Sequence, residues 1–339
     1  MGRRPTAQDV ADLAGVSRSA VSLVLNGRAN GVISAVNQEA VLEAARRLEY
    51  TPNAVAQSLR TSRTRILGVL TWRGVGGLPL HMMAAALQTS LANGYKLIKM
   101  YAEPSASDQR RALSTLGNQQ VDGMLVVAPE LCEYEPVEEL LASPAVLLNC
   151  HDPGQRLTGV VPDEEGAGRG AVEVLLGRGH RDIAVLSGPL SHPQTRLRAG
   201  GAVRAIEAAG IRPRQLEAHD LRIDEGLAAA NSLLDAGRPP TALVCTNERL
   251  AVGAMLAAAR LGLRVPADLS LVSLDDREQL SAQLSPEVTR MQRPDDLMAA
   301  HATELLMNWV ETDSSPGAHS YSFVCPLVEG ASVAGPRGG

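Results

Sequence analysis

Side chains suited to phosphate groups and base edges gather near the amino terminus, at Arg18, Ser19 and Ser22. An arginine donates from a planar guanidinium, and a serine hydroxyl both donates and accepts. These residue types can therefore hydrogen-bond to DNA phosphates and to base edges. Val21 and Val24 lie at helical spacing on the other side of the same segment. The pattern predicts a short helix with one buried apolar face and one exposed polar face.

Another short helix is predicted just before this one. Thr6 is expected to cap it, with Asp9 three residues later completing a capping-box-like pair. Gly15 supplies the turn, because a residue without Cβ can take positive φ, and Ser17 caps the following helix. Two helices joined in this way form a helix-turn-helix, whose second helix fits the major groove of DNA. Many short helical hairpins bind nothing, so periodicity alone leaves both interpretations open.

The next segment continues a small helical domain and ends in a polar strip. Ser34 is predicted to cap a third helix over roughly residues 35–48, and a short helix over residues 53–60 follows Pro52. Residues 1–65 hold nine arginines and five acidic residues, a net charge of +4, whereas the whole chain carries −5 and the remainder therefore −9. A basic head on an acidic body suits a protein that presents one end to phosphate, although a solvated charge imbalance would look the same.

The rest of the chain alternates apolar strands with helices. Strands are predicted at residues 66–71, 95–100, 123–127, 145–149, 183–187, 242–246 and 269–274, and helices at 81–93, 108–119, 168–176, 198–209, 225–236 and 250–261. This alternation predicts an α/β body of doubly wound parallel sheets with helices on both faces. At 339 residues, the chain can bury at least two cores.

No set of catalytic residues stands out. The sequence has no Gly-x-Ser-x-Gly elbow and no Walker loop, and the glycine-rich run at residues 166–170 lacks dinucleotide spacing. The seven histidines and four cysteines show no metal-ligand spacing, which favours reduced thiols. We therefore expect no enzyme, no cofactor and no metal site. No apolar stretch has the form of a signal peptide or a membrane span, so we expect a cytoplasmic protein with no membrane contact.

The segment from Asp9 to Gly27 resembles the start of a transcriptional regulator of the lactose-repressor (LacI) family, and Tyr50–Thr61 resembles that family's hinge. The resemblance continues almost to the carboxyl terminus. It implies an all-α helix-turn-helix head at residues 1–62, followed by a two-lobed periplasmic-binding-protein-like body at 63–333 that binds an effector and dimerises. Residues 334–339 are expected to form a flexible tail.

The same resemblance implies a sequence-specific DNA-binding regulator, a repressor, whose operator affinity is controlled by a small molecule. A sugar or sugar derivative is the default effector in this family. The alternative is a solute-binding protein, which shares the body fold. A solute-binding protein would need a signal peptide and no DNA-binding head, so this chain contradicts it twice.

For DNA, the resemblance implies that a homodimer reads a palindromic operator in double-stranded DNA. Its hinge helices are too short to be stable alone, and they would order as a pair on the minor groove, where Leu59 enters a base step. Ordinary packing of Leu59 against the third helix is the alternative. Leu23 stands where arginine is frequent and cannot hydrogen-bond to a base, so the operator sequence does not carry over. The expected DNA contacts are Thr6, Ser17, Arg18, Ser19, Ser22, Asn26, Asn53, Ala54, Ala56, Leu59 and Arg60.

For the effector, the resemblance implies a site between the lobes, at the carboxyl ends of the strands. Arg198 and Asp275 match family positions that face the ligand, although Arg198 could instead pair with a neighbouring acid and Asp275 could cap a helix. Arg293 stands where glutamine is frequent. An added arginine in the cleft would favour an anionic or highly hydroxylated ligand, and a position of Arg293 outside the cleft is the alternative. The expected effector contacts are Trp72, Asn149, Arg198, Asn247, Asp275 and Arg293.

Overall fold

The chain divides into a head, Met1–Arg65, and a body, Ile66–Gly339. The computed structural model describes residues 5–25, 29–50, 63–74, 79–235 and 237–337. In the described part of the head, α1 (Ala7–Ala14), α2 (Arg18–Leu25) and α3 (Ala35–Arg47) surround one small core. Each helix contributes one fully buried valine, namely Val10, Val21 and Val41. The three helices predicted before residue 50 are confirmed, and the helix predicted over residues 53–60 lies outside the described residues.

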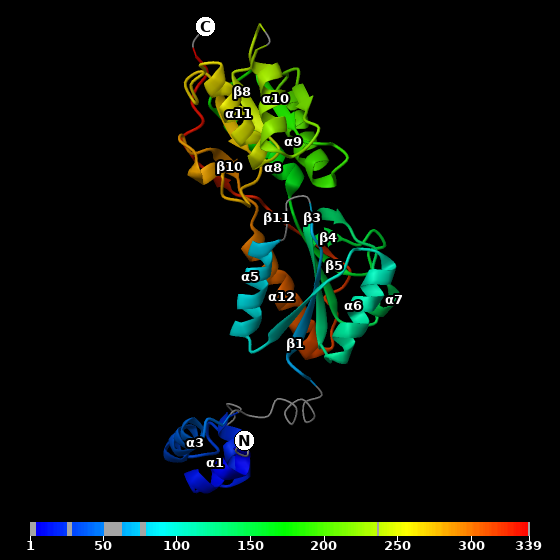
Figure 1. The fold of residues 1–339 in the computed structure, drawn as a ribbon, viewed down its shortest axis with the longest axis vertical. Coiled ribbons are helices and arrows are strands. Elements are labelled where there is room, and N and C mark those ends of the chain that lie inside the picture. Colours follow the sequence, from blue (N-terminus) through cyan, green and yellow to red (C-terminus); the bar gives the residue numbers. More distant parts are fainter. Residues whose placement is uncertain (1–4, 26–28, 51–62, 75–78, 236, 338–339) are drawn as a thin grey trace. The chain divides into compact units, whose positions relative to one another are not determined.

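The body has an amino lobe and a carboxyl lobe, each built on its own sheet (Figure 1). In the amino lobe the strand order is β11-β5-β4-β3-β1-β2, and all neighbouring strands are parallel. The strands are β1 (Ile66–Thr71), β2 (Lys96–Tyr101), β3 (Gly123–Glu133), β4 (Ala145–His151), β5 (Thr158–Pro162) and β11 (Ser320–Phe323).

Helices cover both faces of the amino-lobe sheet. Helices α5 (Leu80–Ala92) and α12 (Asp295–Thr312) lie on one face, and α6 (Ala106–Asn118) and α7 (Glu138–Leu141) lie on the other (Figure 1). Successive side chains of a strand point to opposite faces. Accordingly, Leu125 of β3 packs in the cluster with α5 and α12, whereas its neighbour Val126 packs in the cluster with α6 and α7.

The carboxyl lobe repeats this layered arrangement. Its strand order is β12-β10-β9-β8-β6-β7, with parallel neighbours except for the antiparallel pair of β10 and β12. One core cluster joins the sheet to α8 and α9, and another joins it to α10 and α11. The elements are β6 (Ile183–Ser187), β7 (Arg214–Glu217), β8 (Ala242–Cys245), β9 (Ser270–Ser273), β10 (Thr289–Met291), β12 (Leu327–Val328), α8 (Glu164–Gly177), α9 (Pro193–Ala208), α10 (Ile223–Leu234), α11 (Glu248–Arg260) and the 3₁₀ helix η1 (Ser281–Gln283).

The structure confirms the doubly wound parallel sheets and corrects several boundaries. The helix predicted from residue 168 begins at Glu164, because the Asp163 carboxylate accepts from the Gly166 backbone nitrogen at 2.7 Å and caps it. The helix predicted from Arg198 begins at Pro193, a residue that suits the first helical position. Arg198 therefore lies inside α9. The sequence analysis did not predict β5, β7, β10, β11, β12, α7 or α12.

The chain passes from one lobe to the other after β5, after β10 and after β11. As a result α12, which follows β10 of the carboxyl lobe, packs against β3, β4 and β5 of the amino lobe. Beyond β12 the chain stays attached to the carboxyl lobe, since the Ala334 oxygen accepts from His180 Nε2 at 2.8 Å. Arg337 then forms an ion pair with Asp268.

A close contact between α8 and α9 depends on glycine. A Cβ at Gly168 would overlap the Arg198 backbone oxygen and lie 2.9 Å from the Ala202 nitrogen. We expect Gly168→Ala to lower the free energy of unfolding by about 1–3 kcal/mol in urea titrations, through overpacking. At Gly177, in the last turn of the same helix, an added Cβ meets no atom within 4 Å. Gly177→Ala is therefore the control, and equal losses in both variants would contradict the packing argument.

Candidate DNA-contact helix and ligand cleft

The head presents its second helix through local capping. The Thr6 hydroxyl accepts from the Asp9 nitrogen at 3.3 Å, and the Asp9 carboxylate accepts from the Thr6 nitrogen at 2.7 Å. Gly15 ends α1 with φ of 67°, and the Ser17 hydroxyl accepts from the Ala20 nitrogen at 3.1 Å. The predicted capping box, glycine turn and Ser17 cap are therefore confirmed. Thr6 and Ser17, both expected at DNA, serve here as caps.

The two faces of α2 differ sharply in polarity. Ala20, Val21 and Val24 are buried in the head core. Arg18 and Ser19, together with Ser17 and Ser22, are exposed. This exposed face can approach an external phosphate or base edge. Asn26 and the predicted hinge contacts Asn53, Ala54, Ala56, Leu59 and Arg60 lie outside the described residues.

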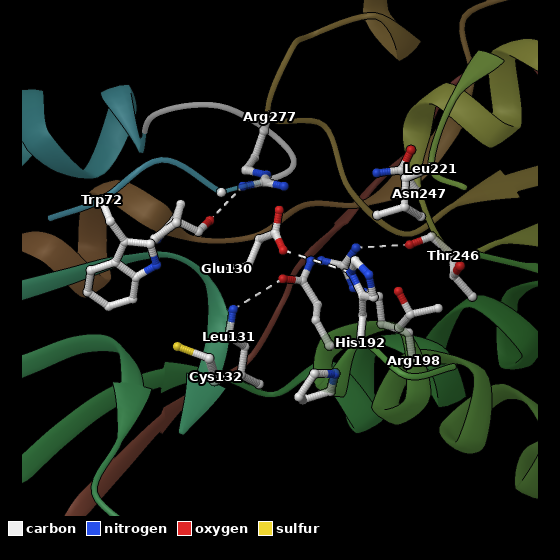
Figure 2. Close-up of a pocket in the computed structure, with 15 residues that line it drawn as sticks. Trp72, Glu130, Leu131, Cys132, His192, Arg198, Leu221, Thr246, Asn247 and Arg277 are labelled. Atoms are coloured by element: carbon white, nitrogen blue, oxygen red, sulfur yellow. Dashed lines mark hydrogen bonds and ion pairs between the residues drawn. The ribbon is translucent and has the colours of Figure 1, made fainter. Parts of the chain in front are cut away.

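In the body, a cavity of about 140 Å³ is lined by residues of both lobes (Figure 2). Trp72 and Pro129 line it from the amino lobe, and Arg198, Asn247 and Arg277 line it from the carboxyl lobe. We call it the first cavity. Its walls are joined by contacts between the lobes. Arg277 donates to the Pro129 oxygen at 2.7 Å, and His192 of the carboxyl lobe lies 4.0 Å from the Glu130 carboxylate.

Arg198 forms the most buried charged cluster at this cavity. Its Nε and Nη2 donate to the two carboxylate oxygens of Glu164 at 2.5 and 3.0 Å. Its Nη1 donates to the Thr246 oxygen at 2.9 Å and lies 3.3 Å from the Asp275 carboxylate. Burial alone would lower the pKa of Arg198, but Glu164 and Asp275 outweigh burial and raise it. Arg198 therefore pairs with neighbouring acids, the alternative left open by the sequence, while still lining the cavity.

Asp275 is held in its charged form by the same cluster. Burial alone would raise the pKa of its carboxyl group, but Arg198, Arg277 and Arg293 outweigh burial and hold that pKa well below the usual range. Its Oδ1 accepts from the Asp276 nitrogen at 2.9 Å, in a segment that is not helical. Asp275 thus caps no helix. The helix cap in this region is Asn247, whose Oδ1 accepts from the Arg249 nitrogen at 2.8 Å at the start of α11.

The predicted effector residues do not all meet in one place. Trp72, Arg198 and Asn247 line the first cavity, where the Trp72 ring stacks on Tyr134 with centroids 5.8 Å apart. Asp275 and Arg293 line a second cavity of about 290 Å³. Asn149 is fully buried, donates to the Ala128 oxygen at 3.0 Å and is absent from the lining of both cavities.

Sequence reasoning missed two residues that matter here. Glu164 neutralises Arg198, but it lies four residues before the predicted start of its helix. Arg277 lines both cavities, and the only signal was its place in a run of charges after a predicted strand. Arg293, predicted to face the ligand, donates from Nε and Nη2 to Asp295 at 2.6 and 2.9 Å, so its charge is already neutralised.

Glu248, the first residue of α11, holds the segment that carries Arg277. Its carboxylate accepts from the Glu278 nitrogen at 2.6 Å and from the Leu280 nitrogen at 3.0 Å. Burial raises the pKa of this carboxyl group from 4.5 to about 7, with a smaller contribution from Asp275, against the opposing effect of the two backbone donors. The group therefore titrates near neutral pH.

We expect Glu248→Gln to make stability less dependent on pH. In the wild type, the folded state keeps the Glu248 proton between about pH 4.5 and about pH 7, whereas the unfolded state loses it above pH 4.5. Protonated Glu248 therefore stabilises the folded state fully below pH 4.5, and this stabilisation is lost as pH rises through about 7. The free energy of unfolding should fall by up to about 3 kcal/mol between about pH 5 and about pH 8, relative to the variant. Urea titrations at both pH values test this. Glutamine keeps one acceptor oxygen for the two nitrogens, so the test compares how stability changes with pH and not the absolute stabilities. Parallel profiles would contradict the assignment.

A helix-turn-helix head followed by a two-lobed α/β body defines a class of DNA-binding regulator. The family described as "Bacterial regulatory proteins, lacI family" matches residues 6–53, and a "Periplasmic binding protein-like domain" matches residues 155–333. The chain is 31% identical over 335 residues to the HTH-type transcriptional repressor PurR of Edwardsiella ictaluri, covering 97% of each chain, and 31% identical over 334 residues to PurR of Salmonella heidelberg, again covering 97% of each. The chain belongs to the LacI family of transcriptional regulators.

Solved structures agree with this assignment. A Lac repressor bound to ONPG is 28% identical, with a TM-score of 0.73 and coverage of 97% of this chain and 100% of that one. A CelR–cellobiose complex is 25% identical, with a TM-score of 0.64 and the same coverage. The family relatives are transcriptional regulators rather than solute-binding proteins or enzymes. Among the described residues, no helix is long and apolar enough to cross a membrane.

Proposed function

We propose that the protein is a repressor that binds a palindromic operator in double-stranded DNA as a homodimer. The support is the exposed face of α2, where Arg18, Ser19 and Ser22 gather, together with the net charge of +4 over residues 1–65. A solved Lac repressor dimer bound to operator is 28% identical, has a TM-score of 0.74 and covers 98% of this chain. Two heads are needed because one short recognition helix makes too few base contacts for a specific site.

The proposal extends to control by a small-molecule effector, a sugar or sugar derivative, held between the lobes of the body. One observation carries it: the first cavity is lined by residues of both lobes, so a ligand there would contact both. Such a ligand changes the relation of the lobes and thereby couples two sites through a shared two-state element. Trp72, Arg198 and Asn247 would contact the effector directly, and Asp275 would orient Arg198.

In this proposal residues 1–62 form the DNA-binding domain with its hinge, and residues 63–333 form the effector-binding and dimerising domain. The predicted tail, residues 334–339, is bonded to the carboxyl lobe at Ala334 and Arg337. The hinge contacts Asn53, Ala54, Ala56, Leu59 and Arg60 and the helix-terminal Asn26 belong to the DNA interface. Arg293 lines the second cavity, and Asn149, fully buried, lines neither cavity. The protein acts in the cytoplasm, catalyses no reaction and needs no cofactor or metal.

Two measurements test the proposed function. Enrichment of random DNA by the full chain should select a palindrome, and thermal-shift screening against sugars, nucleosides and small acids should find a compound that raises the unfolding midpoint by mass action. That compound should change the affinity for the selected DNA in gel-shift assays. Selection of no palindrome, or a ligand without effect on DNA affinity, would contradict the proposal.

A further inference from the structure

Arg277 joins the two lobes across the cleft. It belongs to the segment after β9 in the carboxyl lobe, and its Nη1 donates to the Pro129 oxygen of β3 in the amino lobe at 2.7 Å (Figure 2). Its Nε lies 3.4 Å from the Asp275 carboxylate. Because Arg277 lines both the first and the second cavity, a ligand in either one meets this side chain.

The three cleft arginines differ in how their charge is neutralised. Arg198 forms a bidentate ion pair with Glu164 through Nε and Nη2, and Arg293 forms a bidentate ion pair with Asp295. Among the described residues, no carboxylate pairs with Arg277 in this way, and its single carboxylate contact is shared with Arg198. A guanidinium fork matches a carboxylate with two parallel bonds. Arg277 is therefore the cleft arginine whose matching anion is not supplied by the described chain.

The Arg277 side chain lines both cavities, so its position limits the space that a ligand can fill. The first cavity has about 140 Å³ and the second about 290 Å³. Ligand sites commonly have about 300–1,000 Å³, so the first cavity alone is too small and the second lies at the lower end of that range. Moving the Arg277 side chain would connect them. The movement breaks the bond to the Pro129 oxygen, and a largely buried guanidinium that loses an acceptor needs another one.

The backbone that carries Arg277 is fixed while its side chain can exchange partners. Glu248 accepts from the backbone nitrogens of Glu278 and Leu280, and Arg249 forms an ion pair with the Glu278 side chain. These bonds hold the segment on α11. The guanidinium therefore stays within reach of the cleft after it leaves Pro129, and it can take its new acceptor from the ligand.

We propose that Arg277 determines effector specificity by exchanging the Pro129 carbonyl for a carboxylate of the effector, bound through two parallel hydrogen bonds. The inference rests on the proposed function, in which the effector binds in this cleft. It narrows the effector from sugars and their derivatives to an acidic derivative, such as a uronic or aldonic acid. Arg277 also links the lobes before the ligand arrives, so the ligand competes directly with an inter-lobe contact.

Paired probes test the specificity of the site. The full chain is titrated with D-glucuronate, D-galacturonate and D-gluconate and with their neutral partners D-glucose, D-galactose and D-glucitol, by thermal shift and calorimetry. We expect at least one acid to bind about tenfold or more tightly than its neutral partner, because charge-assisted bonds are the stronger ones. Arg277→Gln should remove that preference, and Arg277→Lys should keep only part of it. Arg264→Gln, which removes an exposed arginine that lines neither cavity, should keep it fully.

A neutral sugar that binds as tightly as its acid, or an acid preference that survives in Arg277→Gln, would overturn the inference. Hydrogen exchange of the ligand-free chain provides a second readout. Residues 128–133 should exchange faster in Arg277→Gln than in the wild type, because the contact to Pro129 is lost, and unchanged exchange would overturn the inter-lobe link. If none of the six compounds binds, that result would count against the cleft as an effector site and hence against the proposed function. The hydrogen-exchange result would still decide whether Arg277 links the two lobes.

Discussion

Arg198→Ala is expected to lower the free energy of unfolding by about 3–5 kcal/mol, because it leaves two carboxylates buried without their central cation. The Arg198 side chain is 3% exposed, and the side chains of Glu164 and Asp275 are 0% and 1% exposed. Asp275 retains Arg277 at 3.4 Å, whereas Glu164 loses the partner that contacts both of its oxygens. Urea titration of the full chain measures the loss.

The control for this prediction removes the Glu164 carboxylate together with the Arg198 guanidinium that neutralises it. In Arg198→Met/Glu164→Gln, no unpaired carboxylate remains at position 164, so the double variant should be more stable than Arg198→Met alone. A loss below about 1 kcal/mol in Arg198→Ala would show that water or a rearranged side chain replaces the guanidinium. A missing effector response in Arg198→Ala would therefore report a disturbed body as well as a lost ligand contact.

Most interior strands of the body could be predicted from the sequence, although β5 and β10 were missed. Among the described edge strands, β2 was predicted, whereas β7, β11 and β12 were not. β1 and β6 coincide with their predictions, because strands buried on both faces form continuous apolar runs. β7, Arg214–Glu217, pairs with β6 alone, and its side chains alternate between half-buried and exposed, so no such run exists. β11 pairs with β5 across a sequence separation of about 160 residues, and nothing local signals that pairing.

The same difference between local and distant signals applies to the candidate site. Residues that follow central strands, such as Asn247 and Asp275, could be placed at the cleft because the carboxyl ends of parallel strands meet at one edge. The pairing of Arg198 with Glu164 spans 34 residues and depends on how α8 packs against α9. The contact of Arg277 with Pro129 spans 148 residues and crosses between lobes. Such contacts are fixed by tertiary packing, which periodicity does not report.

DNA binding is expected to weaken steeply as salt rises, by a factor of about 10³ or more between about 50 and about 200 mM monovalent salt. Residues 1–65 carry a net charge of +4 and the remainder carries −9, so attraction to phosphate is confined to the head. Each phosphate contact releases condensed counterions, and a dimer with two heads doubles the number of contacts. Fluorescence anisotropy with the selected palindrome, titrated at several salt concentrations, gives the slope of log affinity against log salt.

Arg18→Ala tests whether the exposed face of α2 contributes to that slope. Arg18 is exposed at the start of α2, and the loss of one phosphate contact in each head should reduce the slope by about 1 per head, or about 2 for the dimer. Arg111→Ala removes the same charge from an exposed position on α6 in the body, so it should leave the slope unchanged. Equal slopes for the wild type and Arg18→Ala would place the phosphate contacts elsewhere in the head. A wild-type affinity that does not change with salt would exclude phosphate neutralisation as the source of binding.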